Sequence, residues 1–177
     1  AINVGLVGSE MCIRDRHEAP TPSSLQVQDF VRQAFAWSEA DDVDSALQLR
    51  DALEGHERWN SSRRESTLRE VKQRLLAASR IVVIGAAVSV EDLRSYDVNT
   101  AFVAADGSVG ALPDYSQLIC VVSDLDGAKH LDAAAAHGQT ILVHAHGDNK
   151  SQWQDRIIRW NNLESPPSLI LSHQVNQ

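Results

Sequence analysis

Short apolar runs alternate with longer segments through the second half of the 177-residue chain, and this alternation limits the fold more than any other feature. The runs occupy residues 81–84, 101–104, 118–122, 140–143 and 168–171. Segments long enough for helices separate them, notably residues 128–137 and 150–162. Because strands that alternate with helices are joined by crossover connections, we predict an α/β fold with an open, mainly parallel, three-layer (Rossmann-like) sheet. Runs 81–84 and 118–122 are apolar throughout, which predicts strands covered on both faces.

The preceding part, residues 23–78, repeats apolar residues at helical spacing and predicts helices without chemistry of their own. A first helix would contain Val27, Phe30, Val31 and Phe35. Asp41 or Asp42 would cap the second helix and Gly55 would end it. A third would span residues 62–78, with Leu68, Val71 and Leu75 facing inward.

Composition excludes several classes of function. With 43% hydrophobic residues the chain has enough apolar material for one ordinary core. A net charge of −8, with Lys72, Lys129 and Lys150 as its lysines, argues against nucleic acid as a partner. No apolar stretch approaches the roughly 18 residues of a membrane span, and no secretory signal is evident. We therefore expect a cytoplasmic protein that does not engage membranes.

Residues 5–16, GLVGSEMCIRDR, back-translate to the transposase adaptor of a common short-read sequencing library. We interpret residues 1–16 as an artefactual, adaptor-derived segment and exclude them from the fold. Met11 and Cys12 fall within it, so the natural N-terminus is expected to be missing. Cys120, in an apolar run, is then expected to be a core residue, with no disulfide framework. The remaining chain is expected to divide into a helical region, 17–79, and an α/β catalytic domain, 80–177.

Polar clusters follow each predicted strand: GAAVSV, DG, SDLDG, HAHGDN and SHQ. The carboxyl ends of parallel strands share one edge, where ligands bind in open α/β sheets. We therefore expect Asp106, Asp124 and Asp126 to face the histidine cluster across one cleft. Carboxylates that converge repel one another unless a cation joins them, and oxygen ligands suit Mg²⁺ with substrate phosphates. Phosphate chemistry is also favoured by Gly85, Gly107, Gly127 and Gly147, and Ser89 with Asp92 resembles a capping box.

The stretch AADGSVGAL … DYSQLICVVSDLDG … GQTILVHAHGDN resembles the archaeal 6-hydroxymethyl-7,8-dihydropterin pyrophosphokinases of the MptE type. It is more distantly similar to thiamine pyrophosphokinases, which carry aDGG and GDxDS in matching places. The resemblance covers residues 27–174, and DLDG paired with HAHGDN is its specific part. Two features differ: the family's GxGPSL turn reads GAAVSV here, and its glycine-rich GGFTDGDR segment is lacking after the fifth strand. We therefore expect a C-terminally truncated chain with little or no turnover as it stands.

The resemblance implies transfer of the β,γ-diphosphate of ATP to the hydroxymethyl oxygen of a pterin, with release of AMP and with Mg²⁺ as cofactor. The metal ligands expected are Asp106, Asp124, Asp126 and Asp148. The catalytic residues expected are Asp124, Asp126, His144 and His146, the histidines donating to phosphate oxygens or assisting removal of the alcohol proton. The contacts to ATP expected are Gly85, Ser89, Asp106, Gly107, Gly127, Gly147 and Asn149. The partners expected are thus the pterin and ATP; the oligomeric state is not predicted.

Three alternatives stay open. DLDG is also the nucleophile motif of haloacid-dehalogenase-type phosphatases, in which Asp124 would form an aspartyl phosphate, although Ala128 stands where Thr or Val is usual. A zinc hydrolase would use His144, His146 and Asp148, although Asn149 stands where the expected second histidine would be. The third alternative is a non-catalytic nucleotide-binding fragment. Either histidine can also have a purely structural role, bonded to a neighbouring loop.

Overall fold

The computed structural model describes residues 26–27, 29–30, 33–34, 38–125, 127–147 and 149–172. The predicted strands are confirmed, with differences at their ends of about one residue, the usual uncertainty of element boundaries. The elements follow in the order α2 (Glu39–Glu54), α3 (Ser61–Ala77), β1 (Arg80–Ile84), α4 (Val90–Leu93), β2 (Thr100–Ala105), η2 (Asp106–Ala111), β3 (Leu118–Ser123), α5 (Ala128–Ala136), β4 (Thr140–His144), α6 (Lys150–Asn161) and β5 (Ser168–Ser172).

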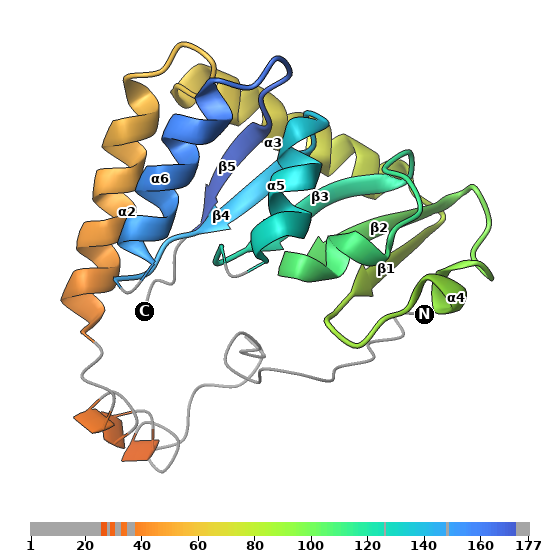
Figure 1. Ribbon diagram of the computed structural model, residues 1–177, viewed down its shortest axis with the longest axis horizontal. Coiled ribbons are helices and arrows are strands. Elements are labelled where there is room, and N and C mark those ends of the chain that lie inside the picture. Colours follow the sequence, from red (N-terminus) through yellow and green to blue (C-terminus); the bar gives the residue numbers. More distant parts are fainter. Residues whose placement is uncertain are drawn as a thin grey trace.

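The strands form one five-stranded sheet in the order β1-β2-β3-β4-β5, and every neighbouring pair is parallel. The order along the sheet is therefore the order along the chain. Because crossovers between parallel strands are right-handed, this order places the connecting segments on the same face. Figure 1 shows η2, α5 and α6 on one face, with α2 beside α6, and α3 on the other. The predicted parallel three-layer arrangement is confirmed.

The main core lies between the sheet and the face that carries η2, α5 and α6. Its buried side chains come from every layer on that side and include Leu49, Trp59, Val109, Leu131, Val143 and Trp153. Burying a side chain of this size contributes about 1.5–3 kcal/mol each. Two tryptophans also bond across the core: Trp59 Nε1 donates to the carbonyl of Pro167 at 2.8 Å, and Trp153 Nε1 to Ser45 Oγ at 3.1 Å. Residues 38–79 thus share one core with the sheet, across the expected boundary at residue 79.

The opposite face of the sheet is covered by α3 alone within the described residues. Val71 of α3 packs with Cys120 and Ile170 in a second, smaller cluster. Burial raises the pKa of the Cys120 thiol, and the interpretation of this cysteine as a core residue is confirmed.

Two expectations about this face are wrong. Leu68 is 52% exposed, although Val71 of the same stripe is buried. On β1, Ile81 and Val83 are 38% and 52% exposed, so this strand is not covered on both faces by the described residues. The reason is topological: β1 is an edge strand, whereas α3 packs over β3 and β5.

The boundaries of α2 and α3 follow from their caps. Ser38 Oγ accepts the N–H of Asp41 at 3.4 Å, so α2 is capped by Ser38, and the expectation that Asp41 or Asp42 caps it is wrong. Gly55 ends α2 as predicted, and Asn60 caps α3. Most of the predicted first helix lies outside the described residues, as do residues 1–16. Among the helices that the structure describes, none combines the length and apolar character needed to cross a bilayer.

Candidate active site at the carboxyl edge of the sheet

The polar clusters after β2, β3 and β4 lie together at the carboxyl edge of the sheet. Asp106 directly follows β2 and opens η2, and Asp124 directly follows β3. The neighbouring parallel strands β2 and β3 bring these two aspartates to the same edge. The expectation that DG, DLDG and HAHGDN share one edge is confirmed for their described residues. Asp126 and Asp148 lie outside those residues.

The two aspartate loops adopt strained backbone conformations next to each other. Asp106 has φ 50° and Leu125 has φ 83°, in the left-handed region that residues other than glycine rarely adopt. Each such residue costs on the order of 1 kcal/mol or more, and such strain persists where the surroundings fix it. Ser123, which is 2% exposed, fixes both: its hydroxyl donates to Asp106 Oδ1 and accepts the N–H of Leu125 at 2.8 Å.

Glycines bring the same two loops into backbone contact. A Cβ atom at Gly127 would lie 2.6 Å from the backbone nitrogen of Gly107 and 2.8 Å from Asp106 Oδ1. Real Cβ atoms do not approach other atoms so closely. Gly127 is therefore required by the contact between the loops.

A cavity of about 900 Å³ opens beside this contact. It is lined by Ala86, Val88, Ser89, Val90, Glu91, Ala105, Asp106, Gly107, Ser108, Gly110, Ala111, Gly127, Lys129 and His130. Four predicted site residues line it, namely Ser89, Asp106, Gly107 and Gly127, whereas Gly85 does not. Lys129 and His130 were not predicted. The only sequence signal for them is their place directly after DLDG, in the first turn of the next helix.

Ser89 has a structural partner in addition to its place in the cavity wall. Its hydroxyl and backbone N–H both donate to Asp92 Oδ2, at 2.7 and 2.9 Å, and the predicted capping box at the start of α4 is confirmed. The side-chain hydrogen bond from Ser89, followed by that from its backbone N–H, holds the pKa of Asp92 below its ordinary value.

The HAHGDN loop is joined to the DLDG loop by Asn149, which is 4% exposed. Asn149 Nδ2 donates to the carbonyls of Asp124 and His144, both at 2.8 Å, and its Oδ1 accepts the N–H of His146 at 2.9 Å. One buried amide thus ties together the loops after β3 and β4. Its contact with ATP stays a prediction.

We expect Asn149→Ala to destabilise the fold by about 3 kcal/mol, because three backbone groups lose their partner in a buried place. Chemical denaturation followed by circular dichroism measures this change. Asn162→Ala is the matched control: Asn162 is exposed and donates only to the carbonyl of Ile158, so its loss is expected to stay within about 0.5 kcal/mol. Equal losses in the two variants would contradict the joining role of Asn149.

The two histidines of HAHGDN pack against each other beyond the cavity wall. Their ring centroids are 4.4 Å apart and the planes are nearly perpendicular. His144 Nδ1 lies 3.0 Å from Ser172 Oγ at the end of β5. This contact fits the alternative that the histidine has a structural role. Neither histidine lines the cavity. The loop after β3 thus contacts the loops on both sides of it: the loop after β2 through Gly127, and the loop after β4 through Asn149.

Helix α2 also reaches this edge. The N–H of Gly147 donates to Asp42 Oδ1 at 2.8 Å, and a Cβ atom at Gly147 would lie 2.8 Å from the Cβ of Asp41. Gly147 is thus needed for close packing against α2. Helix α2 therefore helps to position the HAHGDN loop, although the sequence predicts no chemistry of its own for this part.

Proteins usually bind Mg²⁺ through one or two carboxylates, and water and substrate phosphates supply the other ligands. The oxygen donors at this edge fit that mode of binding. Ser123 occupies Oδ1 of Asp106, and no described residue donates to Oδ2. In the part of the chain that the structure describes, no three His, Cys, Asp or Glu side chains converge as a metal cage. Asp106 and Asp124 are thus the described residues that would hold the ion.

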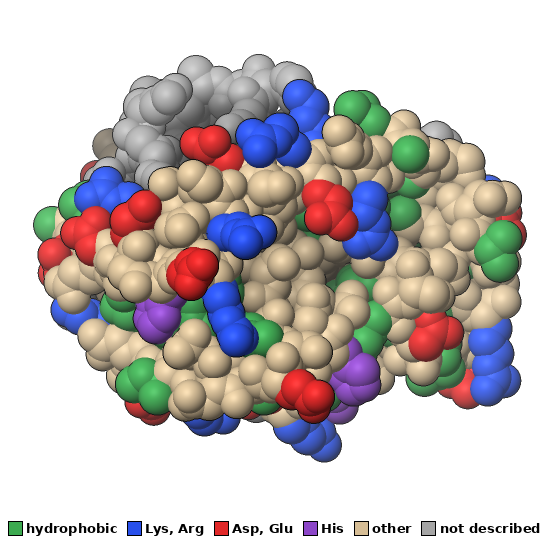
Figure 2. Space-filling view, turned by 90° about the horizontal axis from the view of Figure 1, so that it is seen from above, with side chains coloured by type: hydrophobic (Ala, Val, Ile, Leu, Met, Phe, Trp, Pro, Cys, Tyr) green, Lys and Arg blue, Asp and Glu red, His purple; other side chains and the backbone are tan. Residues whose placement is uncertain are grey.

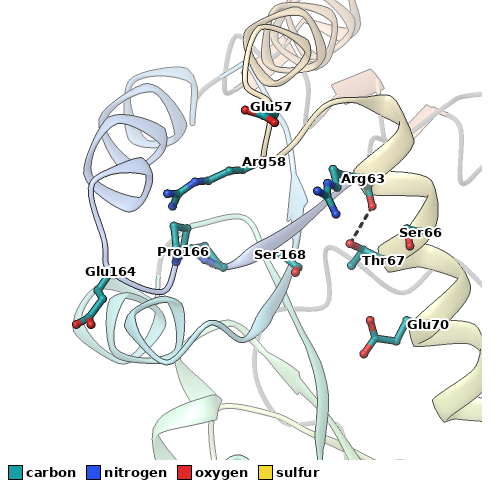
Figure 3. A pocket seen from close by; sticks show the side chains of 10 residues that line it. Glu57, Arg58, Arg63, Ser66, Thr67, Glu70, Glu164, Pro166 and Ser168 are labelled. Atoms are coloured by element: carbon teal, nitrogen blue, oxygen red, sulfur yellow. Dashed lines mark hydrogen bonds between the residues drawn. The ribbon is translucent and has the colours of Figure 1, made fainter.

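A second cavity, of about 580 Å³, lies near the amino end of β5 (Figure 3). Its walls carry both signs of charge, from Arg58 and Arg63 and from Glu57, Glu70 and Glu164. On the face that Figure 2 shows, acidic and basic side chains are likewise interspersed rather than gathered by sign. None of the predicted site residues lines this cavity.

Compared with models of protein families and with curated proteins, the chain matches none.

Proposed function

We propose that the chain is the α/β part of an Mg²⁺-dependent diphosphokinase that transfers the β,γ-diphosphate of ATP to 6-hydroxymethyl-7,8-dihydropterin. One observation carries this proposal: the DG and DLDG loops touch through Gly107 and Gly127, beside a cavity lined by two carboxylates, a lysine and a histidine. A cavity of this size accommodates a nucleotide or a pterin. The resemblance to pterin pyrophosphokinases supplies the substrate and the reaction.

In this proposal the hydroxymethyl oxygen attacks the β-phosphorus, the bond from that phosphorus to the bridging oxygen of AMP breaks, and AMP leaves. Positioning and charge neutralisation provide most of the rate in such transfers. Mg²⁺, when bound, supplies charge neutralisation on the phosphates. Asp106 and Asp124, whose loops touch each other, would hold it. The proposed acceptor of the alcohol proton is the pair His144 and His146, which lies outside the cavity lining, so the proton would pass to it through a bridging water.

The phosphatase alternative requires Asp124 to attack a phosphomonoester. Two features of the sequence support the diphosphokinase over the phosphatase: DLDG is paired with HAHGDN, and Ala128 stands where the phosphatases usually have Thr or Val.

The nucleotide product tests the proposal. With ATP, Mg²⁺ and 6-hydroxymethyl-7,8-dihydropterin, the chain extended by the expected glycine-rich C-terminal segment should release AMP and the pterin diphosphate. Chromatography of the nucleotides separates this outcome from its rivals. Formation of ADP would indicate an ordinary kinase, and inorganic phosphate released from a phosphomonoester would indicate the phosphatase. Either of these products, without AMP, would refute the proposal.

A further inference from the structure

We infer that Lys129 and His130 bind the phosphate chain of the substrate in the cavity that Asp106 also lines. This inference rests on the proposed function and assigns phosphate binding to two residues that belong to none of the sequence motifs. The ligand class is a linear polyphosphate, as in a nucleoside triphosphate.

The first argument is the charge of the cavity wall. Asp106 and Glu91 supply negative charge, and Lys129 and His130 are the basic side chains of the lining. A polyphosphate facing the two carboxylates alone would be repelled. Lys129 offers the opposite charge, and His130 adds a ring N–H donor. An Mg²⁺ ion on the acidic side would complete the binding, so polyphosphate binding should require Mg²⁺.

The second argument is that Lys129 has no ion-pair partner among the residues that the structure describes. Lys150 pairs with Asp44 at 3.9 Å, but no carboxylate in the described ranges lies within ion-pair distance of Lys129. Lys129 also stands in the first turn of α5, which contains no acidic residue and has no side-chain cap. A cation there is disfavoured by the helix dipole. A bound anion would offset this cost.

The third argument is that His130 is held in place by the same loops that shape the cavity. Its ring lies against Gly110 of η2, where a Cβ atom would be 2.3 Å from Nδ1. Its backbone N–H donates to the carbonyl of Gly127 at 3.2 Å. The imidazole therefore contacts η2, which begins at the DG motif, and the backbone of His130 is bonded to the DLDG loop.

Titration calorimetry of the chain with inorganic tripolyphosphate and Mg²⁺ tests the inference. We expect Lys129→Gln to raise the Kd about tenfold, since it removes one charge-assisted contact. His130→Ala is expected to raise it by a smaller factor. Arg63→Gln is the matched control, because it removes one positive charge from the wall of the second cavity, where the Arg63 side chain lies (Figure 3).

An unchanged Kd in Lys129→Gln, or the tenfold loss in Arg63→Gln instead, would overturn the inference, as would failure of tripolyphosphate to bind. The proposed function fails separately. If tripolyphosphate binding depends on Lys129 but the extended chain forms no AMP with the pterin, the polyphosphate site stands and the diphosphokinase does not.

Discussion

Gly127→Ala is expected to destabilise the protein by about 3 kcal/mol and to separate the DG and DLDG loops. The added Cβ would lie 2.6 Å from the backbone nitrogen of Gly107 and 2.8 Å from Asp106 Oδ1, and neither loop can move without disturbing Ser123. Overpacking against backbone costs about 1–3 kcal/mol and sometimes more. In a protein of this size the melting temperature should fall by roughly 10 °C. Binding of tripolyphosphate should weaken in parallel, because Gly127 also lines the cavity.

Gly85→Ala is the matched control for this prediction. Gly85 follows β1 at the same edge of the sheet, but a Cβ atom there would meet nothing within 4 Å. We expect a change in stability within about 0.5 kcal/mol. If Gly127→Ala melts like Gly85→Ala, the close contact between the loops is not a property of the protein in solution.

The sheet was predictable because the period of the apolar residues changes along the chain. Strands β1 to β5 coincide with the apolar runs, and parallel pairing follows from the helical segments between them. Parallel pairing in turn places Asp106 and Asp124 at one edge. The start of α4 was also predictable, because Ser89 and Asp92 stand at the spacing of a capping box.

Two features could not be predicted from the sequence: which strands a helix covers, and which residues bond to one another in the site. Both depend on contacts between segments that are distant in the sequence. An apolar run such as β1 shows that a strand is suited to burial, but not that α3 passes over β3 and β5 instead. Asn149 stood in a polar loop and was predicted as a ligand contact, yet it bonds the carbonyl of Asp124, 25 positions away. Lys129 looked like an ordinary helix residue because only the three-dimensional structure shows that no described carboxylate pairs with it.

Asp106→Asn is expected to lower the rate of AMP formation by the extended chain about 100-fold or more while leaving the fold intact. The substitution removes the negative charge that the proposed function places on Mg²⁺, and the loss of one such electrostatic contact costs about 10²–10³ in rate. Stability should hold for two reasons. Asparagine is among the residues that tolerate a φ of 50°, and its carbonyl oxygen can still accept the hydroxyl of Ser123.

Asp106→Ala separates charge from structure in this prediction. Alanine at φ 50° is strained and cannot accept the hydrogen bond from Ser123, so this variant should lose both activity and about 1–3 kcal/mol of stability. Steady-state rates and thermal melts of the two variants, measured side by side, distinguish the cases. If Asp106→Asn keeps most of the activity, the carboxylate is needed only as the partner of Ser123, and the metal must be held elsewhere. If its activity is lost but its melting temperature equals that of the unsubstituted chain, the charge itself is required, because the backbone strain and the Ser123 hydrogen bond are the same in both proteins.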